Sequence, residues 1–488
     1  MTPPINRRDF CRTAALATTA LSTGLLPAAT PNRPNIVYVL ADDLGWGDMA
    51  CYNPASAIPT PNGNRLATQG MRFTDMHSPS AVCTPTRYGI LTGRYSWRTR
   101  LKKGVLDGYS PYLIEEGRLT VPAMLKSQGY YTAGVGKWHL GLGTEEKTDY
   151  SKPLHPCPTD RGFDYYYGIP ASLDMPPYLF FENDHAVEQP TATTPGQNAP
   201  RGVFWRPGPI SPGLKLEEVL PTITDKAVSI IQNRAKTPDQ PFFLYVAFSG
   251  PHTPWLPKPE NRGRSKAGDY GDFVTEVDDL IGRISQAIDD AKIGNNTLFI
   301  VTSDNGADWK LEDKERYAHL ANATWRGEKA DVWDGGHRIP FIARWPGHIM
   351  PGTVNNHLGC LTDLMGTLAA LTGVKLPDNA GEDSYNLLTE LLGPPAKPVR
   401  DAIVHHSNGG MFAIREGSWK LELGLGSGGF SPPATVEQAP GGPAGQLYDL
   451  SKDPEERYNL YQKRPEVVDR LSTLLEKYKS QGYTRPKS

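Results

Sequence analysis

The sequence predicts an α/β protein, with a doubly wound, mainly parallel sheet and a smaller C-terminal α+β domain. Uninterrupted β-branched and aliphatic runs at residues 35–41 and 241–248 are typical of strands buried on both faces of a parallel sheet. Segments with helical apolar spacing separate these runs. Beyond residue 393, short runs alternate in the manner of antiparallel strands, which indicates the second, smaller domain.

The first predicted segment, residues 1–30, is a twin-arginine signal peptide. Arg7 and Arg8 precede a weakly apolar run from Ala14 to Leu26, and small residues follow it. The run is too short for a membrane span, so we expect no stable membrane anchor. The twin-arginine translocase is the expected partner, and the protein is expected to be periplasmic or secreted.

The predicted large domain covers residues 31–393, and a composition break near Gly393 marks its end. Helical spacing and flanking glycines predict helices at residues 59–70, 119–127, 223–235, 273–288 and 361–371. Further strands are expected at residues 131–135, 297–301 and 340–344. The stretch 160–212 is dense in proline, glycine and aromatic residues, which predicts an irregular insertion that lines a pocket.

The predicted small domain covers residues 394–488. Strands are expected at residues 411–415, 419–422 and 446–450, with a closing helix at 465–479. A loop rich in glycine and proline separates two of these strands.

The composition excludes some classes of partner. The 488 residues are 38% hydrophobic, which is ample for a large core. Fifty-one basic residues against 53 acidic ones give no global attraction for nucleic acid. An anionic substrate must therefore bind at a local site. Once Cys11 leaves with the signal peptide, few cysteines remain, so disulfides are not the framework of the fold.

Cys83 has a position suited to anion chemistry. Pro85 can open a helix and Arg87 lies about one turn further on, so Cys83 would sit in the positive field of a helix N-terminus. From these residues alone, Cys83 is a candidate nucleophile with a depressed pKa. The alternative interpretation is a small buried residue.

Polar residues follow the predicted strands, and the carboxyl ends of parallel strands meet in one crevice. The residues that we expect to converge there are Asp42, Asp43, Lys137, His139, His252, Asp304 and Asn305. Three carboxylates and an amide oxygen suit Ca²⁺ or Mg²⁺ and suit Zn²⁺ poorly. Cations at Arg87, Lys137 and Lys329 can balance a developing anion, and the two histidines can supply an acid and a base. This set predicts metal-assisted hydrolysis of a sulfate or phosphate ester.

The motifs resemble those of a known family. Cys83-Thr84-Pro85-Thr86-Arg87 followed by Leu91-Thr92-Gly93-Arg94 is similar to the signature of the formylglycine-dependent (type I) sulfatases. Similar blocks occur before and after this signature, in the family's order: residues 41–45, 136–139, 250–252, 303–306 and 326–329. The general pattern is closest to the arylsulfatase A and N-acetylgalactosamine-6-sulfatase branch. The resemblance runs from about residue 35 to 450 and implies an alkaline-phosphatase-like fold.

The resemblance also implies residue roles. Asp42, Asp43, Asp304 and Asn305, with an oxygen of the modified Cys83, would bind Ca²⁺ or Mg²⁺. A maturation enzyme would convert Cys83 to formylglycine (3-oxoalanine), whose hydrate attacks sulfur. Lys137 would hold sulfate oxygens, His252 with Lys329 would protonate the leaving alcohol, His139 would deprotonate the second hydroxyl, and Arg87 would orient the hydrate.

The implied substrate is a sulfated glycan or another sulfate ester. Lys137, His252 and Lys329 are the expected substrate contacts, and His405 could reach into the cleft from the small domain. The alternative for His405 and His406 is a pair facing solvent at a strand end. Residues 97–103, 107–109 and 178–181 offer aromatic and cationic groups for a sugar.

Two rival functions remain open from the sequence. Phosphonate monoester and phosphodiester hydrolases share this fold and can share the cysteine motif. A non-catalytic, calcium-dependent binder of sulfated glycans would result if Cys83 stayed a thiol. The presence of both His139 and His252 argues against the binder, because binding alone needs neither an acid nor a base.

Overall fold

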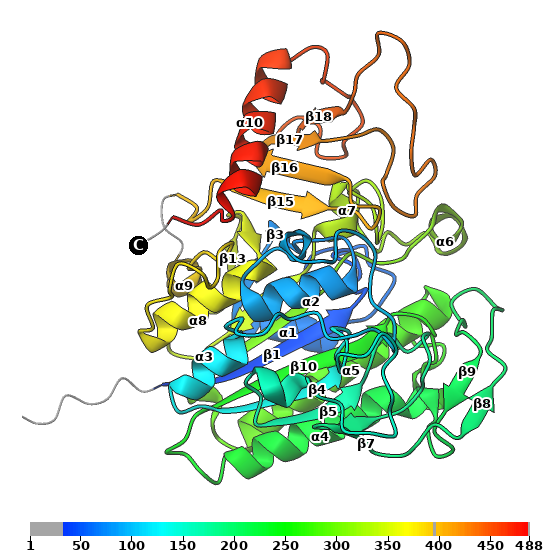
Figure 1. Ribbon diagram of the computed structural model, residues 1–488, viewed down its shortest axis with the longest axis vertical. Coiled ribbons are helices and arrows are strands. Elements are labelled where there is room, and N and C mark those ends of the chain that lie inside the picture. The colour runs from blue at the N-terminus through cyan, green and yellow to red at the C-terminus, as the bar shows by residue number, and fades with distance from the viewer. Residues whose placement is uncertain (1–32, 394–396, 487–488) are drawn as a thin grey trace, which may run out of the picture. The chain divides into compact units, whose positions relative to one another are not determined.

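The computed structural model describes residues 33–393 and 397–486, and the predicted signal peptide lies outside them. Residues 34–488 form one compact unit. Within it, a large α/β part carries a smaller sheet near its C-terminal end (Figure 1). None of the described helices is both long enough and apolar enough to cross a membrane.

The central sheet has ten strands. In spatial order they are β13 (Thr353–Asn355), β2 (Met71–Phe73), β12 (Phe341–Arg344), β11 (Thr297–Ser303), β1 (Asn35–Asp42), β10 (Phe242–Pro251), β4 (Tyr131–Lys137), β5 (Tyr165–Ile169), β6 (Phe181–Glu182) and β7 (His185–Ala186). The strands from β11 to β5 run parallel, and antiparallel pairs flank them on both sides. All eight residues of β1 are buried, as its unbroken apolar run predicts.

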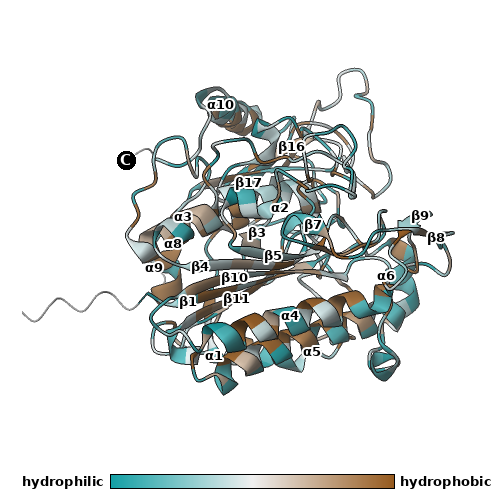
Figure 2. Cartoon of the chain, turned by 60° about the horizontal axis from the view of Figure 1, so that its bottom comes forward, coloured by the Kyte–Doolittle hydropathy of each residue, from teal (hydrophilic) through white to brown (hydrophobic). Residues whose placement is uncertain are grey.

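Helices cover both faces of this sheet, which confirms the predicted doubly wound architecture. One face packs against α1 (Pro61–Gln69), α4 (Val219–Arg234) and α5 (Gly268–Asp290), and the other against α2 (Cys83–Thr92), α3 (Val121–Ser127) and α8 (Leu364–Thr372) (Figure 2). Each face of the sheet has its own hydrophobic core, and alternate residues of β1 pack into them. Tyr38 and Leu40 belong to one core, and Val37 and Val39 belong to the other.

The C-terminal part is a four-stranded antiparallel sheet with one long helix packed on it. Its strands, in order, are β15 (Ala402–His406), β16 (Phe412–Glu416), β17 (Trp419–Glu422) and β18 (Gln446–Asp449), and the helix is α10 (Pro465–Gln481) (Figure 1). Leu471 and Leu475 of α10 pack against Ile403, Ile414 and Leu447 of the sheet. The sequence analysis predicted three of these strands and the helix but did not assign β15.

The predicted irregular insertion at residues 160–212 needs correction. Its first part forms β5, which extends the central sheet, and β6 and β7 continue that edge. Tyr178 and Phe181 are 2% and 0% exposed, so they cannot serve as stacking surfaces for a sugar. Phe181 instead stacks on Tyr166, with ring centroids 5.4 Å apart. Only the later part of the stretch is peripheral, with the small ribbon of β8 (Ala192–Thr194) and β9 (Gly208–Ile210).

Short elements complete the described chain. They are β3 (Met76–His77), α6 (Leu311–Tyr317), α7 (Asp334–His337), β14 (Gly359–Cys360) and α9 (Leu388–Leu392). The carboxyl ends of the parallel strands β1, β4, β10 and β11 lie at one edge of the central sheet. The residues that follow these strands are therefore brought together, as the next subsection describes.

Candidate active site

Three carboxylates from two neighbouring strands meet at this edge. Asp42 is the last residue of β1 and Asp43 follows it, and Asp304 follows β11, which pairs with β1. Oxygens of all three lie within 4.8 Å of one another, and the backbone N–H of Asp43 donates to Asp304 Oδ1 at 3.2 Å. Asp43 has a φ of 66°, a left-handed conformation that is uncommon for a residue with a side chain.

Each carboxylate contacts a cationic side chain. Lys137 Nζ lies 2.6 Å from Asp42 Oδ2, and Lys329 Nζ lies 2.8 Å from Asp43 Oδ2. Arg87 donates from Nε and Nη2 to Asp304 Oδ2, at 3.0 and 2.8 Å. The three cations come from β4, from a loop and from α2. All three are buried, so the cluster balances its charges internally.

Burial and neighbouring charges give two of the carboxylates, Asp42 and Asp304, different pKa values. Burial alone raises the pKa of a carboxyl, but Lys137 and further cations hold the pKa of Asp42 well below its ordinary value. For Asp304, burial and the nearby Asp42 raise the pKa to about 6. Two carboxylates this close disfavour simultaneous ionisation, and a cation bound between them would relieve that repulsion.

The donor set fits a hard divalent cation. Asp42 Oδ1 and Asn305 Oδ1 are buried and have no hydrogen-bond partner among the described residues. Unpartnered buried oxygens are costly unless a ligand satisfies them. The amide of Asn305 is held with its oxygen free, because Nδ2 donates to Asp43 Oδ1 at 2.6 Å. Carboxylate and amide oxygens are the ligands that Ca²⁺ and Mg²⁺ prefer.

Cys83 is the first residue of α2, as predicted, but its predicted acidity is wrong. All ten residues of α2 are buried, and Cys83 is 2% exposed. Burial raises the pKa of the thiol to about 11, even though Lys137 and Lys329 oppose the shift. A neutral thiol is a poor nucleophile, so unmodified Cys83 is unsuited to direct attack. Donor atoms of Asp42, Cys83 and His252 lie within 4.8 Å of one another. The four cysteines of the described chain are unpaired.

His139 is arranged as a base. Its Nε2 lies 2.7 Å from the carbonyl oxygen of Leu106, to which it donates, and its Nδ1 is buried without a partner among the described residues. Burial and the adjacent Lys137 hold the pKa of His139 well below its ordinary value, so the ring is neutral. The residue has a φ of 58°, a second left-handed backbone at the site.

His252 directly follows β10, and its ring lies close to the carboxylate of Asp43. Its Nδ1 lies 2.7 Å from the carbonyl oxygen of Thr253, so Nδ1 donates there and Nε2 is the free ring nitrogen. Nε2 lies 3.8 Å from Asp43 Oδ2, the oxygen that also contacts Lys329. His252 is 7% exposed and so retains some access to solvent.

Ser172 is a candidate site residue that the sequence analysis missed. It follows β5 and lies two residues beyond Pro170, whose carbonyl accepts the backbone N–H of His139 at 2.9 Å. Its hydroxyl is buried and has no partner among the described residues. An assignment of residues 165–169 as a strand would have identified it, because it occupies the same strand-end position as the other site residues.

His405 does not join this cluster. It is fully buried between the two sheets, where Nδ1 donates to the carbonyl of Ser78 at 3.0 Å. Its ring stacks on His337 at 3.7 Å, and Nδ1 of His337 lies 2.9 Å from Nδ1 of His77. The expected reach of His405 into the cleft is therefore absent. Because the stacked rings lie nearly parallel, at 14°, their in-plane lone pairs cannot converge on one metal ion.

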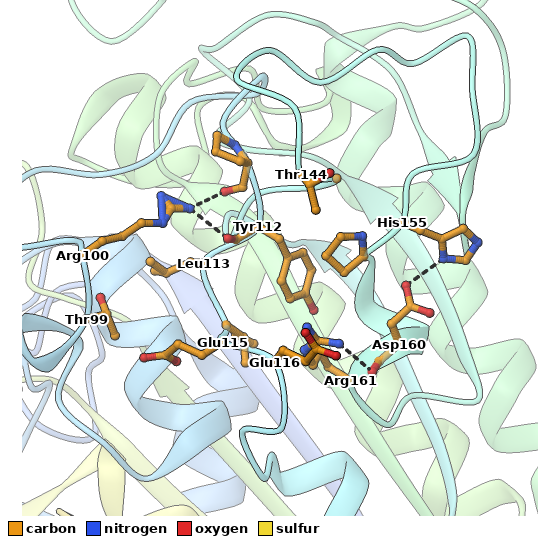
Figure 3. Close-up of a pocket in the computed structure, with 14 residues that line it drawn as sticks. Thr99, Arg100, Tyr112, Leu113, Glu115, Glu116, Thr144, His155, Asp160 and Arg161 are labelled. Atoms are coloured by element: carbon orange, nitrogen blue, oxygen red, sulfur yellow. Dashed lines mark hydrogen bonds and ion pairs between the residues drawn. The ribbon is translucent and has the colours of Figure 1, made fainter.

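A cavity of about 940 Å³ lies elsewhere on the molecule (Figure 3). Tyr112, His155, Asp160 and Arg161 are among the residues that line it. None of the strand-end residues that converge at the site lines this cavity. The backbone N–H of Leu113, also in the lining, donates to the carbonyl of Leu140, so the cavity lining contacts the loop that follows His139. The chemical site and this cavity are therefore lined by different residues.

The comparisons with known proteins identify the family. The sulfatase family model matches residues 34–374, which covers the whole of the site described above. The chain belongs to the sulfatase family. It is accordingly an enzyme of the sulfuric ester hydrolase class, and the resemblance drawn from the sequence motifs is confirmed.

Several sulfatases are similar over nearly the full chain. An N-acetylgalactosamine-6-O-sulfatase of Bacteroides thetaiotaomicron is 37% identical over 486 residues, covering 92% of this chain and 93% of that protein. Human arylsulfatase A is 35% identical, covering 93% of this chain and 89% of that protein. A solved sulfatase structure from work on glycosaminoglycan metabolism by Bacteroides thetaiotaomicron has a TM-score of 0.82 at 35% identity, covering 92% of this chain and all of that chain. The sulfatase fold is thereby confirmed.

Proposed function

We propose that this sulfatase is an exported enzyme that removes sulfate from a sulfated carbohydrate, with formylglycine at position 83 and a bound Ca²⁺. The observation that carries the proposal is the joint burial of three carboxylates, three cations, two histidines and Cys83 at one sheet edge. The printed names of the similar proteins, an N-acetylgalactosamine-6-O-sulfatase among them, support a sulfated amino sugar as the first substrate to test.

The cation would be held by Asp42, Asp43, Asp304 and Asn305, with an oxygen of the modified Cys83. When bound, it supplies positive charge that polarises the sulfate group. Mg²⁺ is the alternative ion, because both take oxygen ligands. The unpartnered oxygens of Asp42 and Asn305 support this assignment.

Cys83 would reach its active form through a maturation enzyme. As formylglycine hydrate, it would present two hydroxyls: one would attack sulfur as the alcohol leaves, and deprotonation of the second would expel the sulfate and restore the aldehyde. The 2% exposure of Cys83 within the buried α2 supports modification before the chain folds. Arg87 would keep the modified residue oriented, since its guanidinium is fixed by Asp304 and by the carbonyl of Lys137 at 2.9 Å.

The lysines would bind the sulfate and the histidines would move protons. Lys137 and Lys329, each fixed by a carboxylate, can hold sulfate oxygens in a site that excludes water. His252 would first take up a proton at Nε2, its free ring nitrogen, and then donate that proton to the leaving alcohol, because a sugar alkoxide is a poor leaving group. His139 would accept a proton at Nδ1 from the residue at position 83. Its low pKa keeps the ring neutral, and its unpartnered Nδ1 is available to accept a proton.

The deciding experiment uses protein purified after export from a host that contains a formylglycine-generating enzyme. We expect a Cys83 peptide about 18 Da lighter than the cysteine form, and release of 4-nitrophenol from its sulfate ester. Cys83→Ala should abolish turnover, and a chelator should reduce it until Ca²⁺ or Mg²⁺ is restored. An unmodified thiol in an active enzyme would contradict the proposed chemistry. Faster hydrolysis of an aryl phosphodiester than of the sulfate would instead favour a phosphodiesterase.

A further inference from the structure

Three loops from distant parts of the chain join into one surface, which we call the rim: residues 102–104, 407–410 and 427–431. The backbone N–H of Gly104 donates to the carbonyl of Asn408 at 2.8 Å, and that of Gly409 donates to Gly428 at 2.9 Å. These bonds connect the loop after α2, the loop after β15 and the long loop between β17 and β18. The rim is thus continuous, although its first and last segments are more than 300 residues apart in the sequence.

The rim is attached to the segment that carries Lys329. The N–H groups of Phe430 and Ser431 both donate to Oδ1 of buried Asp331, at 2.8 and 3.0 Å. The N–H of Asn408 donates to the carbonyl of Ala330 at 2.9 Å. Ala330 and Asp331 directly follow Lys329, whose ammonium contacts Asp43. The rim therefore has a fixed position next to the catalytic cluster.

The other end of the rim connects to the proposed base. Two residues beyond Gly104, Leu106 accepts a hydrogen bond from His139 Nε2 at 2.7 Å. The N–H of Leu106 donates to Thr84 Oγ1, in the first turn of α2, at 3.2 Å. The rim therefore connects the segment that contacts His139 with the segment that carries Lys329.

Phe430 is exposed on this surface and its backbone is pinned. Its side chain is 48% exposed, while its backbone N–H is held by Asp331. The buried Ser427 orders the loop around it: Ser427 Oγ donates to the carbonyl of Ser431 at 2.6 Å and accepts the N–H of Gly429 at 3.1 Å. A single exposed apolar residue is ordinary. A rigidly presented ring beside an active site is a preorganised contact surface.

The rim also carries positive charge. Lys102 and Lys103 are both exposed. The ammonium of Lys102 donates to the carbonyl of Trp97 at 2.6 Å, whereas Lys103 lies against Gly410 with its charge in solvent. A surface that carries both an exposed aromatic ring and a free ammonium suits a ligand that has both an apolar ring face and an anionic substituent. A sugar that carries a carboxylate or a sulfate has both features.

We propose that the rim is a subsite for the sugar next to the one that loses its sulfate, with Phe430 stacking on its ring and Lys103 pairing with its anionic group. The substrate class that follows is an anionic glycan of at least two sugars, in preference to a sulfated monosaccharide. This inference rests on the proposed function for the identity of the reaction, but the binding that it describes does not require turnover.

Calorimetry on the Cys83→Ala protein tests the subsite without maturation or catalysis. The two probes are N-acetylgalactosamine 6-sulfate and a tetrasaccharide that alternates this sugar with a uronate. We expect the tetrasaccharide to bind at least about 10-fold more tightly than the monosaccharide. Adding Phe430→Ala should weaken tetrasaccharide binding about 3- to 10-fold, and Lys103→Ala about 2- to 5-fold, with much smaller effects on the monosaccharide.

Met350→Ala is the matched control. Met350 is 69% exposed and follows β12, which runs antiparallel to β11, so it lies at the sheet edge opposite to the site. It should change neither affinity. Equal affinity of the two probes, no measurable binding of the tetrasaccharide, or an unchanged tetrasaccharide affinity in Phe430→Ala would overturn the subsite. Failure of the matured enzyme to hydrolyse 4-nitrophenyl sulfate would overturn the proposed function instead, and leaves the binding result standing.

Discussion

At this site, we propose that the lysines bind the anion and that the histidines transfer protons. The two proposed proton carriers differ in their surroundings. His139 has a buried, unpartnered Nδ1, whereas His252 is 7% exposed and directs Nε2 toward Asp43. A base that stays neutral and an acid that exchanges protons with solvent are what sulfate ester hydrolysis near neutral pH requires.

The role of His252 predicts an effect that depends on the leaving group. We expect His252→Ala to lower kcat/KM about 100- to 10,000-fold on a sugar sulfate, whose alkoxide needs a proton. On 4-nitrophenyl sulfate the loss should be at least 10-fold smaller, because nitrophenolate leaves readily as an anion. Steady-state kinetics on both substrates provides the measurement. An equal loss on both would assign His252 to sulfate binding and not to protonation.

The site residues were largely predictable because they share one positional rule. Asp42, Lys137, His252 and Asp304 each end or follow a parallel strand that has an obvious apolar run. The low acidity of Cys83 was not predictable, since local sequence shows the helix start but not the complete burial of α2. His405 was misjudged for a related reason: its partners His77 and His337 lie more than 60 residues away in the chain.

At the scale of secondary structure, the apolar runs predicted the central strands and helices, while strands outside the apolar centre of each sheet, such as β5 and β15, were missed. β5 reads Tyr-Tyr-Tyr-Gly-Ile, which looks like an aromatic loop until its pairing with β4 is known. β15 ends in two histidines, a pattern that suggests a strand end more than a strand interior. In both cases tertiary pairing decides the structure, and a single sequence does not show that pairing.

Helix α1 depends on a neighbouring helix for its N-terminal cap. Thr60, at its own cap position, makes no side-chain cap bond. Asp278 of α5 accepts instead the N–H groups of Asn62 and Gly63, at 2.9 and 2.7 Å. Asp278 is 2% exposed, so its carboxylate is held at the positive end of α1 and also ties α1 to α5.

We therefore expect Asp278→Ala to destabilise the protein by about 1–3 kcal/mol, because it leaves buried N–H groups without an acceptor. Thermal and urea unfolding provide the measurement. Asp279→Ala is the control, since the neighbouring side chain is 36% exposed and contacts only Arg264 among the ion pairs of the described chain. Its effect should stay within about 0.5 kcal/mol. Similar losses in both variants would show that α1 is capped in another way.

At the scale of the whole molecule, buried polar groups join the two sheets. Lys420 of β17 contacts Asp334 of α7 at 3.0 Å and Glu456 at 2.6 Å. It also lies 3.1 Å from His337 Nε2, so the ammonium donates to a neutral ring. Next to this pair, the rings of His77, His337 and His405 pack together without exposure. The junction therefore depends on imidazoles that remain uncharged.

This junction predicts that stability falls in mild acid. Burial lowers the pKa of His77 and of His406 to about 4, and holds the pKa of His337 and His405 well below the ordinary value. The unfolded chain takes up protons on these groups below about pH 6.5, while the folded protein does not until about pH 4. Within this window each histidine lowers the free energy of unfolding by about 1.4 kcal/mol per pH unit.

Two glutamates at the junction partly oppose this trend. Burial raises the pKa of Glu422 and of Glu456, so their own contribution to stability increases as the pH falls. A matched variant isolates the histidine contribution. His405→Asn keeps a donor for the carbonyl of Ser78, and the melting temperature measured from pH 7.5 to 5 should fall less steeply than in the unaltered protein. His348→Asn, at an exposed position, should leave the slope unchanged. A His405→Asn slope equal to that of the unaltered protein would show that the imidazoles at the junction are not what acid disrupts.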